Sequence, residues 1–143
     1  MVKVLLMDKV NPKAKEILEK EGSFEVRIEN ELSKDEKLEI IGDYEAVVIR
    51  SSTTFTKEFA DKATNMKLIV RAGAGTDNIE KPYCAEKGIV VENTPGQNSH
   101  AVAELALAHM FGLARNLQEA NGTMQKGEWA KKKLKGTELM GKT

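Results

Sequence analysis

The chain has 143 residues, the length of one ordinary globular domain, of which 41% are hydrophobic and 31% charged. Because 22 basic residues balance 22 acidic ones, the overall charge gives no reason to expect a nucleic acid or an anionic membrane as partner. The single cysteine, Cys84, excludes an intramolecular disulfide, and no His/Cys cluster indicates a metal. No stretch has the character of a secretion signal or a membrane span, so we expect a soluble cytoplasmic protein.

Short apolar runs, four of them clear and one weaker, predict β-strands, and the segments between them have the spacing of helices. The expected strands are residues 2–7, 24–28 (the weaker run), 46–49, 67–70 and 89–91, and the expected helices are residues 12–21, 33–41, 57–62 and 81–86. For the first helix we expect Asn11 as N-cap, Pro12 as first helical residue and Gly22 as stop, and for the second a capping box of Ser33 and Glu36. The alternation predicts an α/β fold: a doubly wound, flavodoxin-like parallel sheet of about five strands, covered on both faces.

Residues 99–118 predict a long helix of a different kind. From Ala101 to Ala114 it is broken only by Glu104, His109 and Gly112, so it should be buried on more than one side. The residues from 121 onward form a polar tail with three consecutive lysines. The chain is therefore expected to divide into an α/β domain, residues 1–98, and a helix-and-tail segment, residues 99–143.

In an open parallel sheet, ligands bind at the carboxyl ends of the strands. The segments expected there are Asp8–Lys9 and residues 50–54, 71–78 and 93–99. Arg50 and Arg71 each leave an apolar strand directly into a loop of small residues. Guanidinium groups and glycine-rich backbones suit a carboxylate or phosphate. Taken singly, either arginine would serve equally well in a surface salt bridge, but two such loops at neighbouring strand ends favour a bound anion.

Two segments match nucleotide-binding motifs only superficially. Gly73 and Gly75 begin the pattern G-x-G-x-x-G, but Asn78 replaces its third glycine and the helix that follows is short. Residues 136–143 match the Walker A pattern, but no strand precedes them and no helix follows. A dinucleotide site at residues 73–78 is therefore the less favoured interpretation, and a nucleotide-binding role for residues 136–143 is the weakest.

These loops, in this order, resemble the D-isomer-specific 2-hydroxyacid dehydrogenase family. The matching segments are residues 48–51, 71–79, 88–91, 93–99, 101–104 and 127–143. The resemblance covers the whole chain, and the Arg50–Ser51 pair and the tail resemble most narrowly the members that oxidise 3-phosphoglycerate. It implies a substrate-binding domain with its connecting helix, cut before the NAD-binding domain and before the catalytic arginine, glutamate and histidine of the family.

The resemblance also implies roles for loop residues of the first segment. Arg50 and Ser51 match the pair that holds the distal phosphate of the substrate. Gly73, Ala74 and Gly75 match the loop whose backbone N–H groups meet the substrate carboxylate. Ala74 also matches a position on the nicotinamide side of NAD; relatives often have Thr there, so only a backbone contribution carries over.

The remaining implied roles concern the second segment and its partners. Asn98 matches an active-site asparagine, and Lys131 falls where a basic residue reaches the phosphate site of a neighbouring subunit. The long helix, residues 99–118, is implied to cross towards the cofactor domain and to lie at a dimer interface. A homodimer, with this helix paired or exchanged between two copies, is therefore expected.

The function expected from these observations is the substrate-binding portion of an NAD-dependent D-2-hydroxyacid dehydrogenase that serves serine biosynthesis. Its substrate would be a small anion such as 3-phosphoglycerate, with NAD required by the complete enzyme but not bound by this chain alone. No catalytic residue and no metal ligand are expected in this chain. The alternative is a stand-alone flavodoxin-like module that binds a small anion or regulates without catalysis. The sequence leaves open which 2-hydroxy acid is used.

Overall fold

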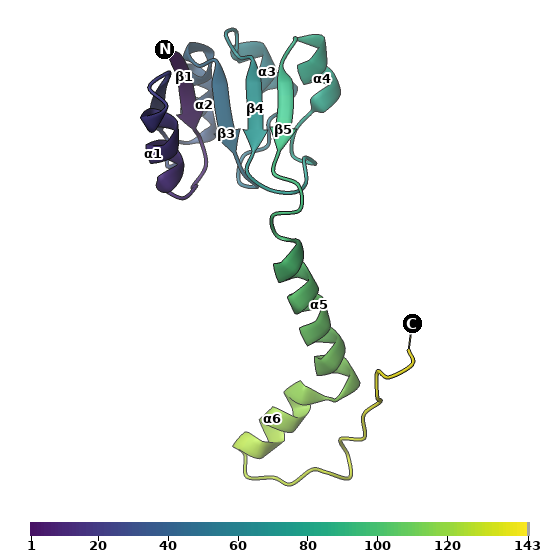
Figure 1. Ribbon diagram of the computed structural model, residues 1–143. Helices are drawn as coiled ribbons and strands as arrows, with labels where there is room; N and C mark the ends of the chain where they lie inside the picture. The colour runs from purple at the N-terminus through teal and green to yellow at the C-terminus, as the bar shows by residue number, and fades with distance from the viewer. Residues whose placement is uncertain (143) are drawn as a thin grey trace. The chain divides into compact units, whose positions relative to one another are not determined.

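The computed structural model describes residues 1–142 and contains a five-stranded parallel sheet of order β2-β1-β3-β4-β5 (Figure 1). The strands are β1 Val2–Leu6, β2 Phe24–Ile28, β3 Ala46–Ile49, β4 Leu68–Arg71 and β5 Val90–Asn93. This order is that of flavodoxin, so the predicted fold class is confirmed. β5 extends past its predicted end at residue 91 because pairing with β4 continues to Asn93, opposite Arg71. The chain divides into two compact units, Met1–Gln97 and Asn98–Thr143.

Helices connect the strands of the first unit and make up most of the regular structure in the second. They are α1 Lys13–Lys20, α2 Lys34–Ile40 with a 3-10 turn η1 Ile41–Asp43, α3 Lys57–Lys62, α4 Lys81–Glu86, α5 Ser99–Ala114 and α6 Leu117–Gln125. The expected capping box is present, since Ser33 N–H donates to Glu36 Oε2 at 2.8 Å and Glu36 N–H donates to Ser33 Oγ at 3.4 Å. The first helix begins one residue later than predicted, with Pro12 at the N-cap. Asn11 nevertheless accepts a hydrogen bond from Lys13 N–H at 3.0 Å.

The strands of the first unit place alternate side chains on opposite faces of the sheet. Leu5 and Met7 pack with α2, α3 and α4, whereas Val4 and Leu6 pack with α1. Right-handed crossovers explain why α1 lies on one face of the sheet and α2, α3 and α4 lie on the other. The chain moves in one direction across the sheet from β1 to β2, and in the opposite direction from β2 through β3 and β4 to β5. The face that bears α1 is covered less fully than expected, and Val90 of β5 on that face remains 54% exposed.

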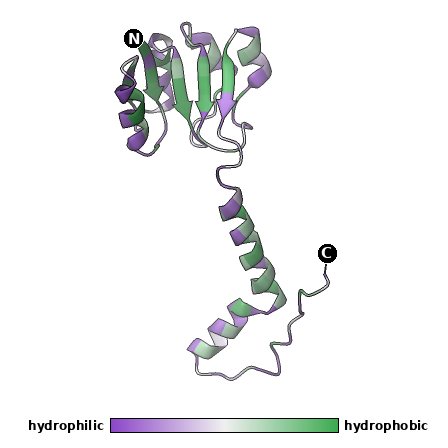
Figure 2. Ribbon diagram, viewed as in Figure 1, coloured by the Kyte–Doolittle hydropathy of each residue, from purple (hydrophilic) through white to green (hydrophobic). Residues whose placement is uncertain are grey.

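The second unit departs from the expected single helix over residues 99–118. Asn116 adopts a left-handed conformation (φ 51°, ψ 38°) that ends α5, and α6 then begins at Leu117 and continues into the predicted tail. No residue of α5 is buried within the single chain, so the expected burial on more than one side stays a prediction. Apolar residues lie along most of α5 (Figure 2), and Leu113 is 81% exposed. An apolar helix sequence predicts a hydrophobic surface, but that surface is buried only where a second surface packs against it.

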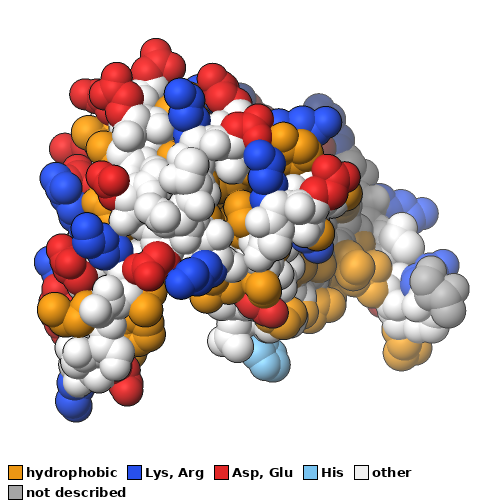
Figure 3. All heavy atoms as spheres, turned by 90° about the horizontal axis from the view of Figure 1, so that it is seen from above, with side chains coloured by type: hydrophobic (Ala, Val, Ile, Leu, Met, Phe, Trp, Pro, Cys, Tyr) orange, Lys and Arg blue, Asp and Glu red, His pale blue; other side chains and the backbone are white. Residues whose placement is uncertain are grey.

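Two observations concern the surface and the membrane. Acidic and basic side chains are interspersed on the face seen in Figure 3, as expected for a chain with balanced charges. Among residues 1–142, none of the helices has the length and apolar character that crossing a bilayer would require.

Candidate anion-binding site

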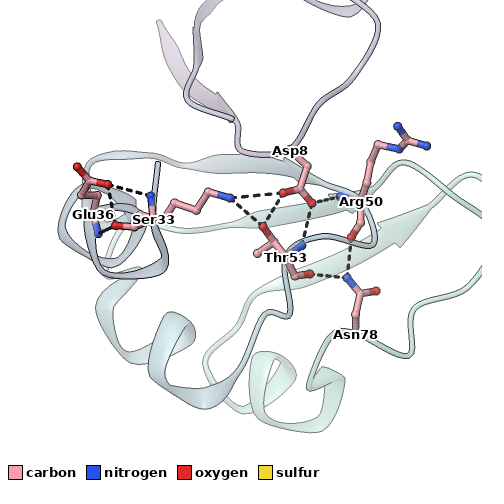
Figure 4. A network of polar contacts seen from close by, with 7 residues as sticks. Asp8, Ser33, Glu36, Arg50, Thr53 and Asn78 are labelled. Carbon is pink, nitrogen blue, oxygen red and sulfur yellow. Dashed lines mark hydrogen bonds and ion pairs between the residues drawn. The ribbon is translucent and has the colours of Figure 1, made fainter. Parts of the chain in front are cut away.

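The carboxyl ends of the parallel strands bring several loops to one edge of the sheet. Asp8 follows β1, residues 50–54 follow β3, and residues 72–78 follow β4. Asp8, Arg50, Thr53 and Asn78 form one network of polar contacts there (Figure 4). The sequence indicated the loops as ligand-binding segments but not this network among them.

Asp8 is the buried centre of the network, with a relative exposure of 2%. Its Oδ2 atom accepts hydrogen bonds from the backbone N–H groups of Arg50 at 2.6 Å and Thr53 at 3.1 Å. Its Oδ1 atom accepts from the Thr53 hydroxyl at 2.6 Å and lies 3.6 Å from the ammonium nitrogen of Lys37. Lys37 also donates to the Thr53 hydroxyl oxygen at 3.2 Å. The carboxylate therefore has three hydrogen-bond donors and one cation beside it, which is how a buried charge becomes tolerable.

Asn78 binds backbone carbonyl groups of the same loop, residues 50–54. Its side-chain N–H group donates to the carbonyl oxygens of Arg50 at 2.7 Å and Thr53 at 2.6 Å. The backbone carbonyl of Asn78 accepts a hydrogen bond from Phe55 N–H at 2.8 Å. Asn78 belongs to the loop after β4, so it fixes the positions of the β3 and β4 loops relative to each other.

The glycine-rich loop after β4 folds closely around the side chain of Arg71. A Cβ atom on Gly73 would meet the Arg71 guanidinium, so a larger residue there would displace the end of this side chain. The Nε atom of Arg71 is buried and has no hydrogen-bond partner among residues 1–142. The next loop is joined to this one by two bonds, from Thr94 N–H to the Gly73 carbonyl at 3.1 Å and from the Asn93 amide to the Ala74 carbonyl at 2.6 Å. Three adjacent loops thus form one connected edge.

The structure brings together the expected site residues of the first unit. Arg50, Ser51 and the segment Gly73–Ala74–Gly75 all lie in the loops at this edge. Arg50 is exposed, and its guanidinium donates to the Lys9 carbonyl at 3.0 Å. Neither Arg50 nor Arg71 forms an ion pair with a carboxylate in the part of the chain that the structure describes. The salt-bridge alternative for these two arginines therefore loses its support.

The other two expected site residues, Asn98 and Lys131, belong to the second unit and are exposed. The described residues of the Walker-like segment, 136–142, contain no helix or strand, and Thr143 lies outside the described residues. Gly136 instead packs against the end of α5, where a Cβ would come within 2.5 Å of the Ala114 carbonyl oxygen. The helix after the glycine-rich loop, α4, has only six residues. Over residues 1–142, no group of three acidic, His or Cys side chains is placed to hold a metal ion.

A pocket of about 480 Å³ lies beside the network. It is lined by Leu32, Lys34, Lys37, Ser52, Thr53, Thr54, Thr56 and Phe59. Both lysines in its wall already pair with carboxylates, Lys34 with Glu58 and Lys37 with Asp8. Because its charges are balanced, the pocket attracts an anion less than the exposed guanidinium of Arg50 does.

The pKa of Asp8 leads to a prediction about stability in acid. Burial alone raises the pKa, but hydrogen bonds from Thr53, Arg50 and Ser52 outweigh it and bring the pKa below its ordinary value. A carboxyl whose pKa falls on folding stabilises the native state above its unfolded pKa, and this contribution is lost as pH falls through the folded pKa. Asp8→Asn should therefore cost about 2 kcal/mol at pH 7 and progressively less below about pH 4.

Urea unfolding of the wild type and of Asp8→Asn at several pH values measures this difference. Glu25→Gln, at an exposed position in β2, serves as the matched control and should change the unfolding free energy little at any pH. A constant difference between wild type and Asp8→Asn from pH 7 to pH 3 would show that ionisation of Asp8 contributes nothing.

A flavodoxin-like sheet with arginine-bearing and glycine-rich loops at its carboxyl edge is the architecture of a ligand-binding α/β domain. Residues 4–136 match the family described as "D-isomer specific 2-hydroxyacid dehydrogenase, catalytic domain". The chain belongs to this family, which confirms the resemblance found in its sequence.

Individual relatives agree with this assignment. The chain is 44% identical to D-3-phosphoglycerate dehydrogenase of Methanocaldococcus jannaschii, matching all of this chain and 27% of the relative. It is 41% identical to hydroxypyruvate reductase of Thermotoga maritima, over 99% of this chain and 46% of the relative. Among solved structures, NAD+-bound 3-phosphoglycerate dehydrogenase of Entamoeba histolytica matches with a TM-score of 0.70 and 36% identity, over 80% of this chain and 39% of the other. The chain thus spans less than half the length of these relatives.

Proposed function

We propose that the chain is the substrate-binding portion of an NAD-dependent D-2-hydroxyacid dehydrogenase, with 3-phosphoglycerate as substrate and a role in serine biosynthesis. The observation that carries the proposal is the edge at which Arg50, free of any ion pair among residues 1–142, lies beside the glycine-rich loop. Relatives named D-3-phosphoglycerate dehydrogenase match over the whole chain, which supports the choice of substrate.

At this edge each end of the substrate has its own binding group. Arg50 and Ser51 would bind the phosphate, since a guanidinium and a hydroxyl together offer several donors to its oxygens. The backbone N–H groups of Gly73, Ala74 and Gly75 would bind the carboxylate. Two anionic groups held at separate points fix the orientation of the carbon between them, which is the contribution of this unit to catalysis.

The complete enzyme would need more than this unit. NAD would accept the hydride from the hydroxyl-bearing carbon, and Ala74 would lie on the nicotinamide side. Asn98 would complete the active site, and Lys131 would reach the phosphate site of a second subunit. The proposed organisation is therefore an α/β domain, residues 1–98, followed by a helix-and-tail segment, residues 99–143, that joins two copies into a homodimer by pairing or exchange of the helix.

Titration of the 143-residue chain with 3-phosphoglycerate, followed by the backbone amide signals in NMR spectra, tests the substrate assignment. The signals of Ser51, Gly73 and Gly75 should shift with a common dissociation constant. D-glycerate, which lacks the phosphate, should shift the two glycine signals but leave Ser51 nearly unchanged. If 3-phosphoglycerate shifts neither loop, the assignment is wrong.

We further expect no NADH to form when this chain alone is mixed with 3-phosphoglycerate and NAD. The first unit carries no complete dinucleotide motif, because Asn78 replaces the third glycine. The Asn78 side chain instead donates hydrogen bonds to the carbonyl oxygens of Arg50 and Thr53 in the neighbouring loop. An absorbance assay at 340 nm measures NADH directly. Sustained formation of NADH by the purified chain would contradict the proposal.

A second candidate function has one observation in its favour. The bonds that connect the three loops all lie within the first unit, Met1–Gln97, so a small anion could be bound there without any further domain. A stand-alone anion-binding module would show tight binding, in the low micromolar range or better, by this chain alone. Millimolar binding would favour the dehydrogenase, in which the remaining contacts come from elsewhere.

A further inference from the structure

The main chain of the loop after β3 is held from two sides by side chains that come from other loops. Asp8 accepts from the N–H groups of Arg50 and Thr53, and Asn78 donates to the carbonyl oxygens of the same two residues. Between these fixed points lie Ser51 and Ser52, whose backbone N–H groups have no protein acceptor among residues 1–142. The loop is therefore fixed at both ends, and the donors at its centre remain available.

We propose that Asp8 and Asn78 are positioning residues for the anion site, an inference that rests on the proposed function. They hold residues 50–53 so that the Arg50 guanidinium and the N–H groups of Ser51 and Ser52 converge on one anionic group of the ligand. Neither side chain touches the ligand itself. Their effect is to form the site before the ligand arrives, so that binding does not have to order the loop.

A buried carboxylate this close to an anion site requires neutralisation, since its charge would otherwise repel the ligand. Lys37 supplies this charge, because its ammonium nitrogen lies 3.6 Å from Asp8 Oδ1, and the two side chains are only 11% and 1% exposed. The two carboxylate oxygens of Asp8 have different partners. Oδ2 accepts from the backbone N–H groups of Arg50 and Thr53, while Oδ1 accepts from the Thr53 hydroxyl and lies near the Lys37 ammonium group. An amide at position 8 can keep the backbone bonds, provided that the ammonium group is removed as well.

This division of roles defines a set of variants. Asp8→Ala removes the backbone bonds, and Asn78→Ala removes the bonds to the two carbonyl oxygens. The double variant Asp8→Asn/Lys37→Gln keeps a hydrogen-bonding oxygen for the backbone and keeps the local charge balanced. Asp61→Ala is the matched control, because this exposed carboxylate bonds Tyr83 and Lys87 and takes no part in the loop network.

The first measurement is the dissociation constant of the 143-residue chain for 3-phosphoglycerate. Asp8→Ala and Asn78→Ala should each raise it about tenfold or more, whereas the double variant and Asp61→Ala should stay within about threefold of the wild type. Recovery of affinity in the double variant is the result that a general loss of stability would not produce. Wild-type affinity in a folded Asn78→Ala variant would overturn the proposal, and this variant decides the matter if Asp8→Ala does not fold.

The second measurement is amide hydrogen exchange at Arg50 and Thr53 without ligand. These two amides should be protected in the wild type and in the double variant, and should lose protection in Asp8→Ala while amides of β1 and β3 keep theirs. If they exchange freely in the wild type, the loop is not held and the proposal fails. If they are protected but the wild type binds no 3-phosphoglycerate, the proposed substrate is wrong and inorganic phosphate replaces it as the probe; an unchanged affinity for phosphate in Asn78→Ala would then overturn the positioning role.

Discussion

Replacing Arg50 with alanine should raise the dissociation constant of the chain for 3-phosphoglycerate roughly ten- to a hundredfold, because a charge-assisted hydrogen bond contributes about 1.5–3 kcal/mol. The constant for D-glycerate should change far less, since that acid has no phosphate for Arg50 to bind. Arg50 is exposed, and among residues 1–142 its guanidinium bonds only the Lys9 carbonyl, so the fold should tolerate the change. Isothermal titration calorimetry with the two acids measures both constants.

Two further variants make the result specific. Arg27→Ala removes another exposed arginine, one that pairs with Glu29, and should leave both dissociation constants unchanged. Arg50→Lys keeps the charge but loses the planar fork, so it should give an intermediate loss for 3-phosphoglycerate. Equal losses for both acids in Arg50→Ala would mean that Arg50 binds the carboxylate or supports the fold.

The second large effect concerns the mass of the chain in solution, which should exceed that of a monomer at micromolar concentration. Helix α5 leaves a set of large apolar side chains about half exposed or more. They are Val102, Leu105, Leu107, Met110, Phe111 and Leu113. At about 25 cal/mol per Å², covering several hundred Å² of such surface contributes several kcal/mol before the costs of association. A second copy of the chain offers the same surface and can supply the cover.

Leu113→Lys should convert this assembly to a monomer, because it places a charge at the most exposed of the large apolar side chains of the helix, at 81%. Ile17→Lys is the control, since Ile17 is also an exposed apolar residue, at 55%, but lies on α1. Multi-angle light scattering of the three proteins over a range of concentrations gives their masses. A wild-type mass that stays at the monomer value on both dilution and concentration would contradict the prediction.

The strands and their loops could be predicted because their signals are local. Ala46–Ile49 is an uninterrupted apolar run, and Arg50 marks its end directly. The partners of Asp8 could not be predicted in this way, since its bond to Arg50 joins residues 42 positions apart. A carboxylate immediately after a buried strand was the available signal, because such a group must find donors nearby.

The second unit shows a different limit of sequence reasoning. The apolar run of α5 was correctly predicted as helix, but the break at Asn116 was not, because no Gly or Pro marks it and Asn can adopt either hand of the helical conformation. Its predicted burial stays a prediction, because burial depends on a second surface and no residue of α5 is buried within the single chain.

The order of the strands also determines how the sheet can be built during synthesis. β3 pairs with β1, β4 with β3 and β5 with β4, while β2 pairs with the opposite side of β1. When each strand after the first leaves the ribosome, a strand with which it pairs has therefore already been synthesised. The sheet can be built up in the order of translation, and no strand depends on a later one for its first pairing. The apolar residues of α5 emerge only after the last strand, so the sheet can pair before this exposed apolar surface leaves the ribosome.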